Sequence, residues 1–149
     1  SSFVRRTTEI DAGTGLSSTT ETAHVEKDTL GNIYDKVTIM WNTTYQYGQY
    51  TVEVRDGSGN NINNAYSSNT NLSIDGTNTI QIGSLTFYKL NTPIKSFAGS
   101  PSIEFYLPHT SIEKYNIRYG DGVPFTLQAY VGSEAITSAI PVKLGIRSP

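Results

Sequence analysis

His24 and His109 are the side chains of this sequence best suited to bind a metal ion or to transfer a proton near neutral pH. The two histidines lie far apart in the sequence, not at the spacing of a helical or hairpin metal site. The chain contains no cysteine, which excludes thiol catalysis and cysteine-ligated zinc or iron. A single histidine next to Pro108 is typical of a loop. We therefore expect no metal site and no bound cofactor.

Hydrolytic chemistry has little support in the sequence. The Gly-x-Ser-x-Gly motif that places a serine nucleophile on a strained turn is absent, and Gly57-Ser58-Gly59 is better explained as a turn. A glycosidase needs two carboxylates that the fold brings together, so the acidic residues are candidates only in that general sense: Glu53, Asp56, Glu104, Glu113, Asp121 and Glu134. No phosphate-binding loop or dinucleotide motif is present. The sequence predicts a protein that is not an enzyme.

Two short segments fit the Asn-x-Ser/Thr acceptor pattern for an N-linked glycan, and their acceptors are Asn42 and Asn71. Such matches also arise by chance in a chain rich in Ser, Thr and Asn. The segments Asp56–Asn60 and Asp75–Asn78 resemble parts of calcium loops but lack the full EF-hand pattern, so we expect turns there.

Three tyrosines, Tyr45, Tyr47 and Tyr50, lie close together around Gly48. If they are exposed, they are candidates for a binding surface that stacks on sugar rings or anchors a protein contact. The alternative, which we favour, is that they line the interior of the fold with their hydroxyl groups at the surface.

The elements that would hold these residues have the two-residue period of β-strands. In residues 50–56 the side chains of Tyr50, Val52 and Val54 alternate with polar ones, and residues 36–42 alternate in the same way. Both segments are predicted to be half-buried strands.

Further strands are expected at similar spacing. Residues 79–82 lead into 84–88 with Gly83 as a bulge or bend, and 102–107 form another strand. Residues 124–131 are expected to pair with 135–144 across a short loop, with Pro141 marking an edge or kink. Only residues 110–116 have a helical pattern, enough for one turn.

These elements predict an all-β, immunoglobulin-like antiparallel β-sandwich of about seven or eight strands over residues 23–149. Residues 1–22 are expected to form an N-terminal arm or linker that is either flexible or donated to a partner subunit. Phe3, Val4 and Ile10 are the arm residues suited to fill a pocket on that subunit.

The composition favours a secreted or cell-surface protein. The 149 residues suit one domain, 16% of them are charged, and roughly a third are Ser, Thr or Asn. A net charge of −2 gives no basic surface for nucleic acid, and no run of residues is apolar enough to span a membrane. Because no signal peptide is visible and the chain begins with Ser1, we expect that a signal or anchor has been removed.

The segments 122–127 and 139–144 resemble the closing strands of immunoglobulin-like domains in archaeal surface filaments, such as pili and threads, and in archaellum-associated proteins. The resemblance covers about the last quarter of the chain, and the cysteine-free composition is similar to that of the same group. The N-terminal apolar helix by which many of these proteins polymerise is missing. The resemblance thus implies either a removed helix or an N-terminal strand that completes the next subunit.

Three functions remain open at this point. The first is an extracellular structural protein, either a filament subunit or a surface-anchored interaction module, whose partner is another protein or a second copy. The second is a carbohydrate-binding module that uses Trp41 and the three tyrosines. The third is a viral coat or tail domain, because β-sandwiches with polar N-terminal arms also build shells.

Overall fold

The computed structural model describes residues 4–10, 17–41, 50–69, 71–97, 102–109 and 125–142, and for 4–10 and 17–26 it describes the backbone alone. Strands make up the regular structure of this part. They are β1 (Val4–Ile10), β2 (Ser17–Lys27), β3 (Ile33–Trp41), β4 (Thr51–Asp56), β5 (Tyr66–Ser67), β6 (Ile74–Ile82), β7 (Leu85–Leu90), β8 (Ile94–Phe97), β9 (Ser102–Pro108), β10 (Phe125–Val131), β11 (Glu134–Ala135) and β12 (Ile140–Val142).

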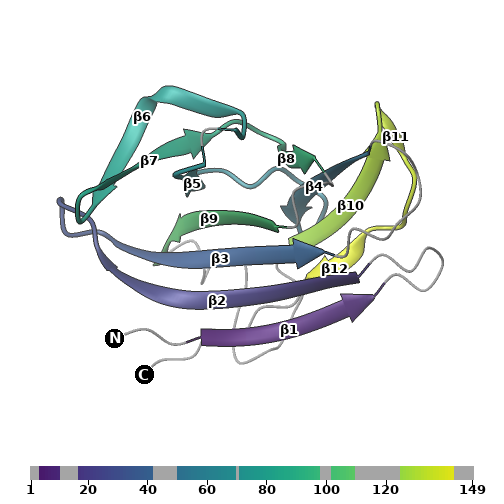
Figure 1. Ribbon diagram of the computed structural model, residues 1–149, viewed down its shortest axis with the longest axis horizontal. Coiled ribbons are helices and arrows are strands. Elements are labelled where there is room, and N and C mark those ends of the chain that lie inside the picture. The colour runs from purple at the N-terminus through teal and green to yellow at the C-terminus, as the bar shows by residue number, and fades with distance from the viewer. Residues whose placement is uncertain are drawn as a thin grey trace.

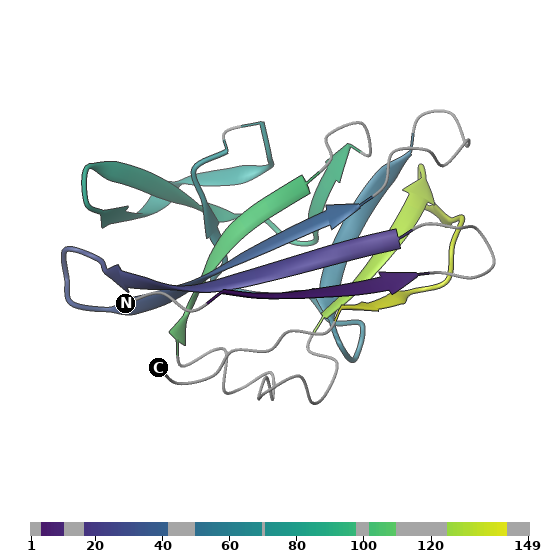
Figure 2. The ribbon, with the colours of Figure 1, turned by 60° about the horizontal axis from the view of Figure 1, so that its bottom comes forward.

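The strands form two antiparallel sheets, which confirms the all-β prediction. The first has the order β1-β2-β3-β9-β5-β7-β6, and the second has the order β11-β10-β4-β8 with β12 also paired to β10. Figure 1 shows the first sheet along the bottom and upper left and the second at the right. In Figure 2, β4 and β10 run at a clear angle to β1 and β2.

One core joins the two sheets. The predicted alternation in β3 and β4 is confirmed, since Val37, Ile39 and Trp41 are buried on one strand and Val52 and Val54 on the other. These side chains meet the apolar residues of β9, β10 and β12 in a single cluster. An aromatic pair spans the sheets, because Phe105 of β9 and Phe125 of β10 have ring centroids 6.0 Å apart in an edge-to-face arrangement.

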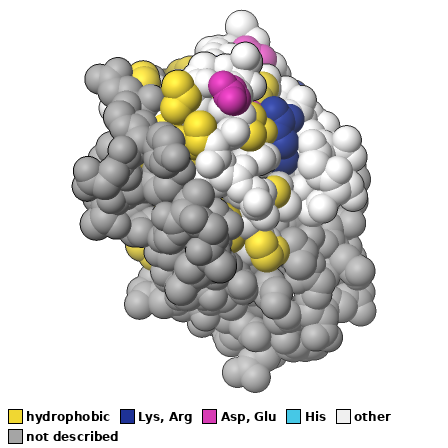
Figure 3. Space-filling model, turned by 90° about the vertical axis from the view of Figure 1, so that its right-hand side faces the viewer, with side chains coloured by type: hydrophobic (Ala, Val, Ile, Leu, Met, Phe, Trp, Pro, Cys, Tyr) yellow, Lys and Arg dark blue, Asp and Glu magenta, His cyan; other side chains and the backbone are white. Residues whose placement is uncertain are grey.

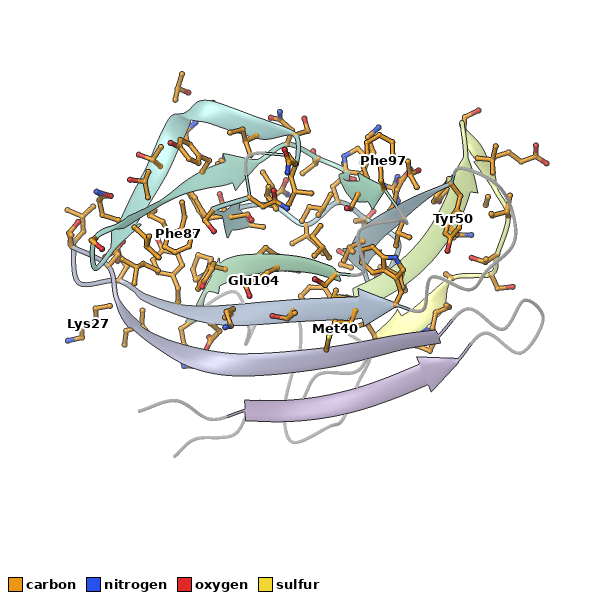
Figure 4. All side chains as sticks on the ribbon, in the orientation of Figure 1. Lys27, Met40, Tyr50, Phe87, Phe97 and Glu104 are labelled. Carbon is orange, nitrogen blue, oxygen red and sulfur yellow. The ribbon has the colours of Figure 1, made fainter. Side chains whose placement is uncertain are left out.

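A second aromatic cluster lies on the other face of the first sheet. The rings of Phe87 and Tyr106 are 4.5 Å apart, and those of Tyr34 and Tyr66 are 6.2 Å apart. In Figure 4, Phe87 lies in the space between β7 and β3. The sheet curls around this cluster, since the amide of Thr29, in the β2–β3 turn, donates a 3.0 Å hydrogen bond to the carbonyl of Gln81 in β6.

The N-terminal region differs from the expected arm. The described part of residues 1–22 lies in two strands, because β1 pairs with β2 from Val4↔Ala23 to Ile10↔Ser17 and β2 pairs with β3. The boundary expected between residues 22 and 23 falls inside β2, so it is not the end of an element. Polar and charged residues fill most positions of these strands, and their sequence therefore lacks the apolar alternation that identified β3 and β4.

Three local expectations are settled by the strand registers. Gly83 is not a bulge but, with Ser84, a two-residue hairpin turn between Ile82 and Leu85, and its φ of 62° suits glycine. The segment at Asp75 lies within β6, where the pairing with β7 is irregular between Asp75 and Thr79. The predicted hairpin between β10 and β12 is confirmed, with β11 added at its turn. The expected helical turn at 110–116 lies outside the described residues.

Candidate functional site

A groove at one edge of the second sheet combines an exposed ring with several polar side chains. It has a volume of about 230 Å³ and is lined by Thr51, Asn69, Asn71, Leu72, Ser73, Lys95, Ser96 and Phe97. Phe97 ends the edge strand β8, and 73% of its surface is exposed. It projects away from the ribbon in Figure 4, and the end of the molecule where β8 and β10 lie shows hydrophobic side chains beside isolated charged ones (Figure 3).

The loop that forms one wall of the groove is held by local hydrogen bonds. The amide of Asn69 donates to Oγ of Ser67 at 3.1 Å, and Oδ1 of Asn69 accepts from the amide of Asn71 at 3.0 Å. The amide of Leu72 donates to the Asn69 carbonyl at 3.2 Å, which closes a turn. Leu72 is buried in the core while Asn71 is exposed. The loop therefore presents the Asn71 amide to solvent on an anchored backbone.

Strand pairing brings a second aromatic residue onto the same face. Phe97 pairs with Thr51 and Thr51 pairs with Tyr130, and cross-strand partners share a face of the sheet. Because Val52 and Val54 point into the core, this face is the outer one. Two strand spacings separate Phe97 from Tyr130, which is about 10 Å.

Two polar groups of the groove have no partner within the described part of the chain. Neither the Asn71 side-chain amide nor the Lys95 ammonium takes a hydrogen bond or ion pair there. Lys95 lies opposite Glu53 in the register, but the Glu53 carboxylate binds Arg55 at 2.7 Å instead. The groove thus offers an aromatic face, an amide and a cation to a ligand.

A buried carboxylate forms a separate polar centre on the first sheet. Asp35 lies on the core-facing side of β3, with none of its surface exposed, and its Oδ2 is 2.7 Å from Nδ1 of His109. An ionised carboxylate only accepts hydrogen bonds, so we assign the proton to Nδ1, which donates in this pair. The His109 side chain is 42% exposed. The pair therefore links a buried charge at one strand to the surface at the end of β9.

A hollow of about 480 Å³ lies beside this histidine. Its described lining consists of Gly31, Asn32, Ile33, Tyr34, Pro108 and His109. Burial and then the nearby Asp28 carboxylate raise the pKa of Tyr34 to about 12, so the phenol stays protonated at neutral pH. Oδ1 of Asp28 accepts hydrogen bonds from the backbone amides of Leu30 and Asn32, at 2.9 and 2.8 Å. The described lining holds a histidine and a neutral phenol but no serine, threonine or cysteine nucleophile.

The structure places the residues predicted to act at the surface in different environments. Tyr50 is 6% exposed and belongs to the core, so it does not form a binding surface in this structure. Its hydroxyl is buried as well, whereas the favoured alternative placed the tyrosine hydroxyls at the surface. Asn71 lies on an exposed turn, as a glycan acceptor must. Val4 and Ile10 are the ends of β1. Phe3, Asn42, Tyr45 and Tyr47 lie outside the described residues.

The described ranges lack two further features, a metal-binding group and a membrane-spanning helix. No group of three or more metal-binding side chains occurs among them, and none of their helices could cross a membrane.

No protein-family model matches this sequence, and no match is found among curated proteins or among solved structures.

Proposed function

We propose that this protein is an extracellular structural protein that assembles with copies of itself by main-chain pairing along β1. The observation that carries the proposal is that β1 is an edge strand. It is paired on one side, by β2, within the described part of the chain. An edge strand presents a row of free N–H and C=O groups to which another strand can add.

A comparison of the described edges favours β1 over the others. β8 has four residues, β12 three and β11 two, and β6 has an irregular register between Asp75 and Thr79. Short edge strands and bulges are the devices that prevent pairing between molecules. β1 has neither device, since its seven residues pair with β2 without a break. It is therefore the edge best suited to accept the strand of a second copy.

The composition of the chain and its resemblance to archaeal filament domains support this proposal. A surface rich in hydroxyl and amide groups with little charge suits an exported protein and strand-to-strand assembly. An immunoglobulin-like relation to archaeal filament domains agrees with the confirmed hairpin between β10 and β12. In such a filament the N-terminal strand either pairs at its open edge or is donated to the neighbouring subunit.

A pair of proline variants tests the proposal. Successive amides of a strand point to opposite edges, so one of Thr7→Pro and Thr8→Pro removes a donor from the β1–β2 pairing and the other removes a donor from the open edge. We expect the open-edge variant to keep the wild-type melting temperature and to lose assembly. Light scattering and negative-stain electron microscopy measure the assembly. If wild type stays monomeric at high concentration, or if the stable variant assembles unchanged, the proposal is wrong.

A further inference from the structure

We infer that the groove lined by Asn71, Lys95 and Phe97 binds a sugar ring. This inference goes beyond self-assembly, because the groove lies at β8 of the second sheet whereas β1 is an edge of the first. A sugar has an apolar C–H face and a polar rim of hydroxyl groups. A site for it needs an exposed aromatic face next to hydrogen-bonding groups that are not already satisfied.

Phe97 supplies the aromatic face. This residue is 73% exposed, and nothing in the described part of the chain covers it. Stacking against a flat C–H surface would remove this area from water, which is the main favourable contribution to such binding. Tyr130, about 10 Å away on the same face, lies where a second ring of a longer saccharide would reach.

The polar rim of the groove has the amides and hydroxyls that sugars require. Six of its eight described lining residues are polar: Thr51, Asn69, Asn71, Ser73, Lys95 and Ser96. None of them is acidic, and the Lys95 ammonium is not paired with a carboxylate in the described part of the chain. This charge favours a sugar that carries a carboxylate over a neutral one.

The same sugar could come from two sources. Asn71 begins the acceptor pattern Asn71-Leu72-Ser73 on an exposed turn and itself lines the groove, so a glycan attached to it would begin beside Phe97. A free saccharide would use the unmodified Asn71 amide as a hydrogen-bonding group. Both sources place one face of a ring against Phe97, and the experiment separates them.

For the free source, the unglycosylated chain is titrated with digalacturonate and, for comparison, with cellobiose, while two-dimensional NMR follows the backbone amides. We expect shifts at residues 69–73 and 95–97 and tighter binding of the acidic disaccharide. Phe97→Ala should weaken this binding about tenfold, the upper range for one aromatic contact. Leu85→Ala is the matched control, because Leu85 is also exposed, at 59%, but lies on β7 outside the groove.

For the attached source, the chain is produced in a glycosylating host and compared with Asn71→Gln. A mass increase that is lost in Asn71→Gln, together with an altered Phe97 ring signal in the glycosylated form, assigns the groove to the chain's own glycan. Binding of free disaccharide that depends on Phe97 assigns it to an external ligand. If neither the disaccharides nor glycosylation changes the Phe97 environment, the inference is wrong. Both measurements use dilute monomer, so a failure of the assembly proposal leaves them interpretable.

Discussion

Replacement of Phe105 by alanine should test whether the two sheets share one core. Phe105 has no exposed surface and meets Phe125 of the opposite sheet edge to face at 6.0 Å. A buried phenylalanine removes about 150–250 Å² from water, and at about 25 cal/mol per Å² this area corresponds to roughly 4–6 kcal/mol as an upper bound. Measured Phe→Ala costs in cores are about 3–5 kcal/mol. We expect a loss in that range for Phe105→Ala and for Phe125→Ala.

The double variant gives the sharper result. If the rings stabilise each other across the sheets, the two losses should not add, and the coupling should be about 0.5–1.5 kcal/mol. Urea unfolding measures these values. The fluorescence of Trp41, the single tryptophan, is a suitable probe because this side chain is 5% exposed. Where the alanine variants do not fold, Phe→Leu variants at the same two positions keep the cycle measurable.

Phe97→Ala serves as the control, since a largely exposed side chain should change stability by no more than about 0.5 kcal/mol. Additive losses at Phe105 and Phe125 would refute the argument that this pair holds the sheets together. A Phe105→Ala loss as small as that of the control would refute the arrangement of the core itself.

Three further predictions concern polar groups. His109→Ala should lower the free energy of unfolding by about 1.5–3 kcal/mol, measured in urea, because it removes a charge-assisted partner of the buried Asp35. Hydrogen bonds from Thr77 lower the pKa of Asp75 to about 2 from its ordinary 3.8. The ionised form of Asp75 therefore stabilises the fold above about pH 4, and this contribution is lost as the pH falls towards 2. Thermal melts of Asp75→Asn should show a weaker pH dependence than those of wild type between about pH 4 and pH 2. Asp28→Asn should lower the pKa of Tyr34 from about 12 while leaving it above 10, because burial is the larger cause, and an ultraviolet phenolate titration measures it.

The sequence predicted those strands whose apolar residues alternate. β3, β4, β9 and β10 each bury every second side chain in one shared core, and this burial is the physical cause of the pattern. β1 and β2 could not be found in this way, because polar and charged residues fill most of their positions on both faces. The curl of the first sheet also has no local signal, since it brings together segments that are far apart in the sequence, such as Thr29 and Gln81.

The candidate sites, too, could be predicted only where a local sequence pattern indicates them. The alternation extended back by one position would have placed Asp35 on the apolar face of β3 with Val37, and an acid at a core position indicates a buried pair. Its partner His109 is 74 residues away, so the pair itself depends on the strand register. The exposure of Phe97 could not be predicted either. A phenylalanine near a predicted core is normally assigned to it, and this ring faces water because the register of β8 places it on the outer face of an edge strand.

The two proposals concern edge strands of different sheets, and this separation decides how they combine. β1 is the outermost strand of the first sheet and β8 the outermost strand of the second, so a copy that adds to β1 lengthens one sheet without using the other edge. Variants at distant sites with no shared partner act independently, so an open-edge proline in β1 and Phe97→Ala should each remove one property and together remove both. In an assembly built along β1 every subunit would keep its Phe97 groove open. A polysaccharide long enough to reach two grooves should therefore bind the assembled form more tightly than the monomer, whereas a disaccharide should bind both forms equally. Weaker polysaccharide binding by the assembled form would show that assembly covers the groove, and equal binding would show that one of the two sites has been misassigned.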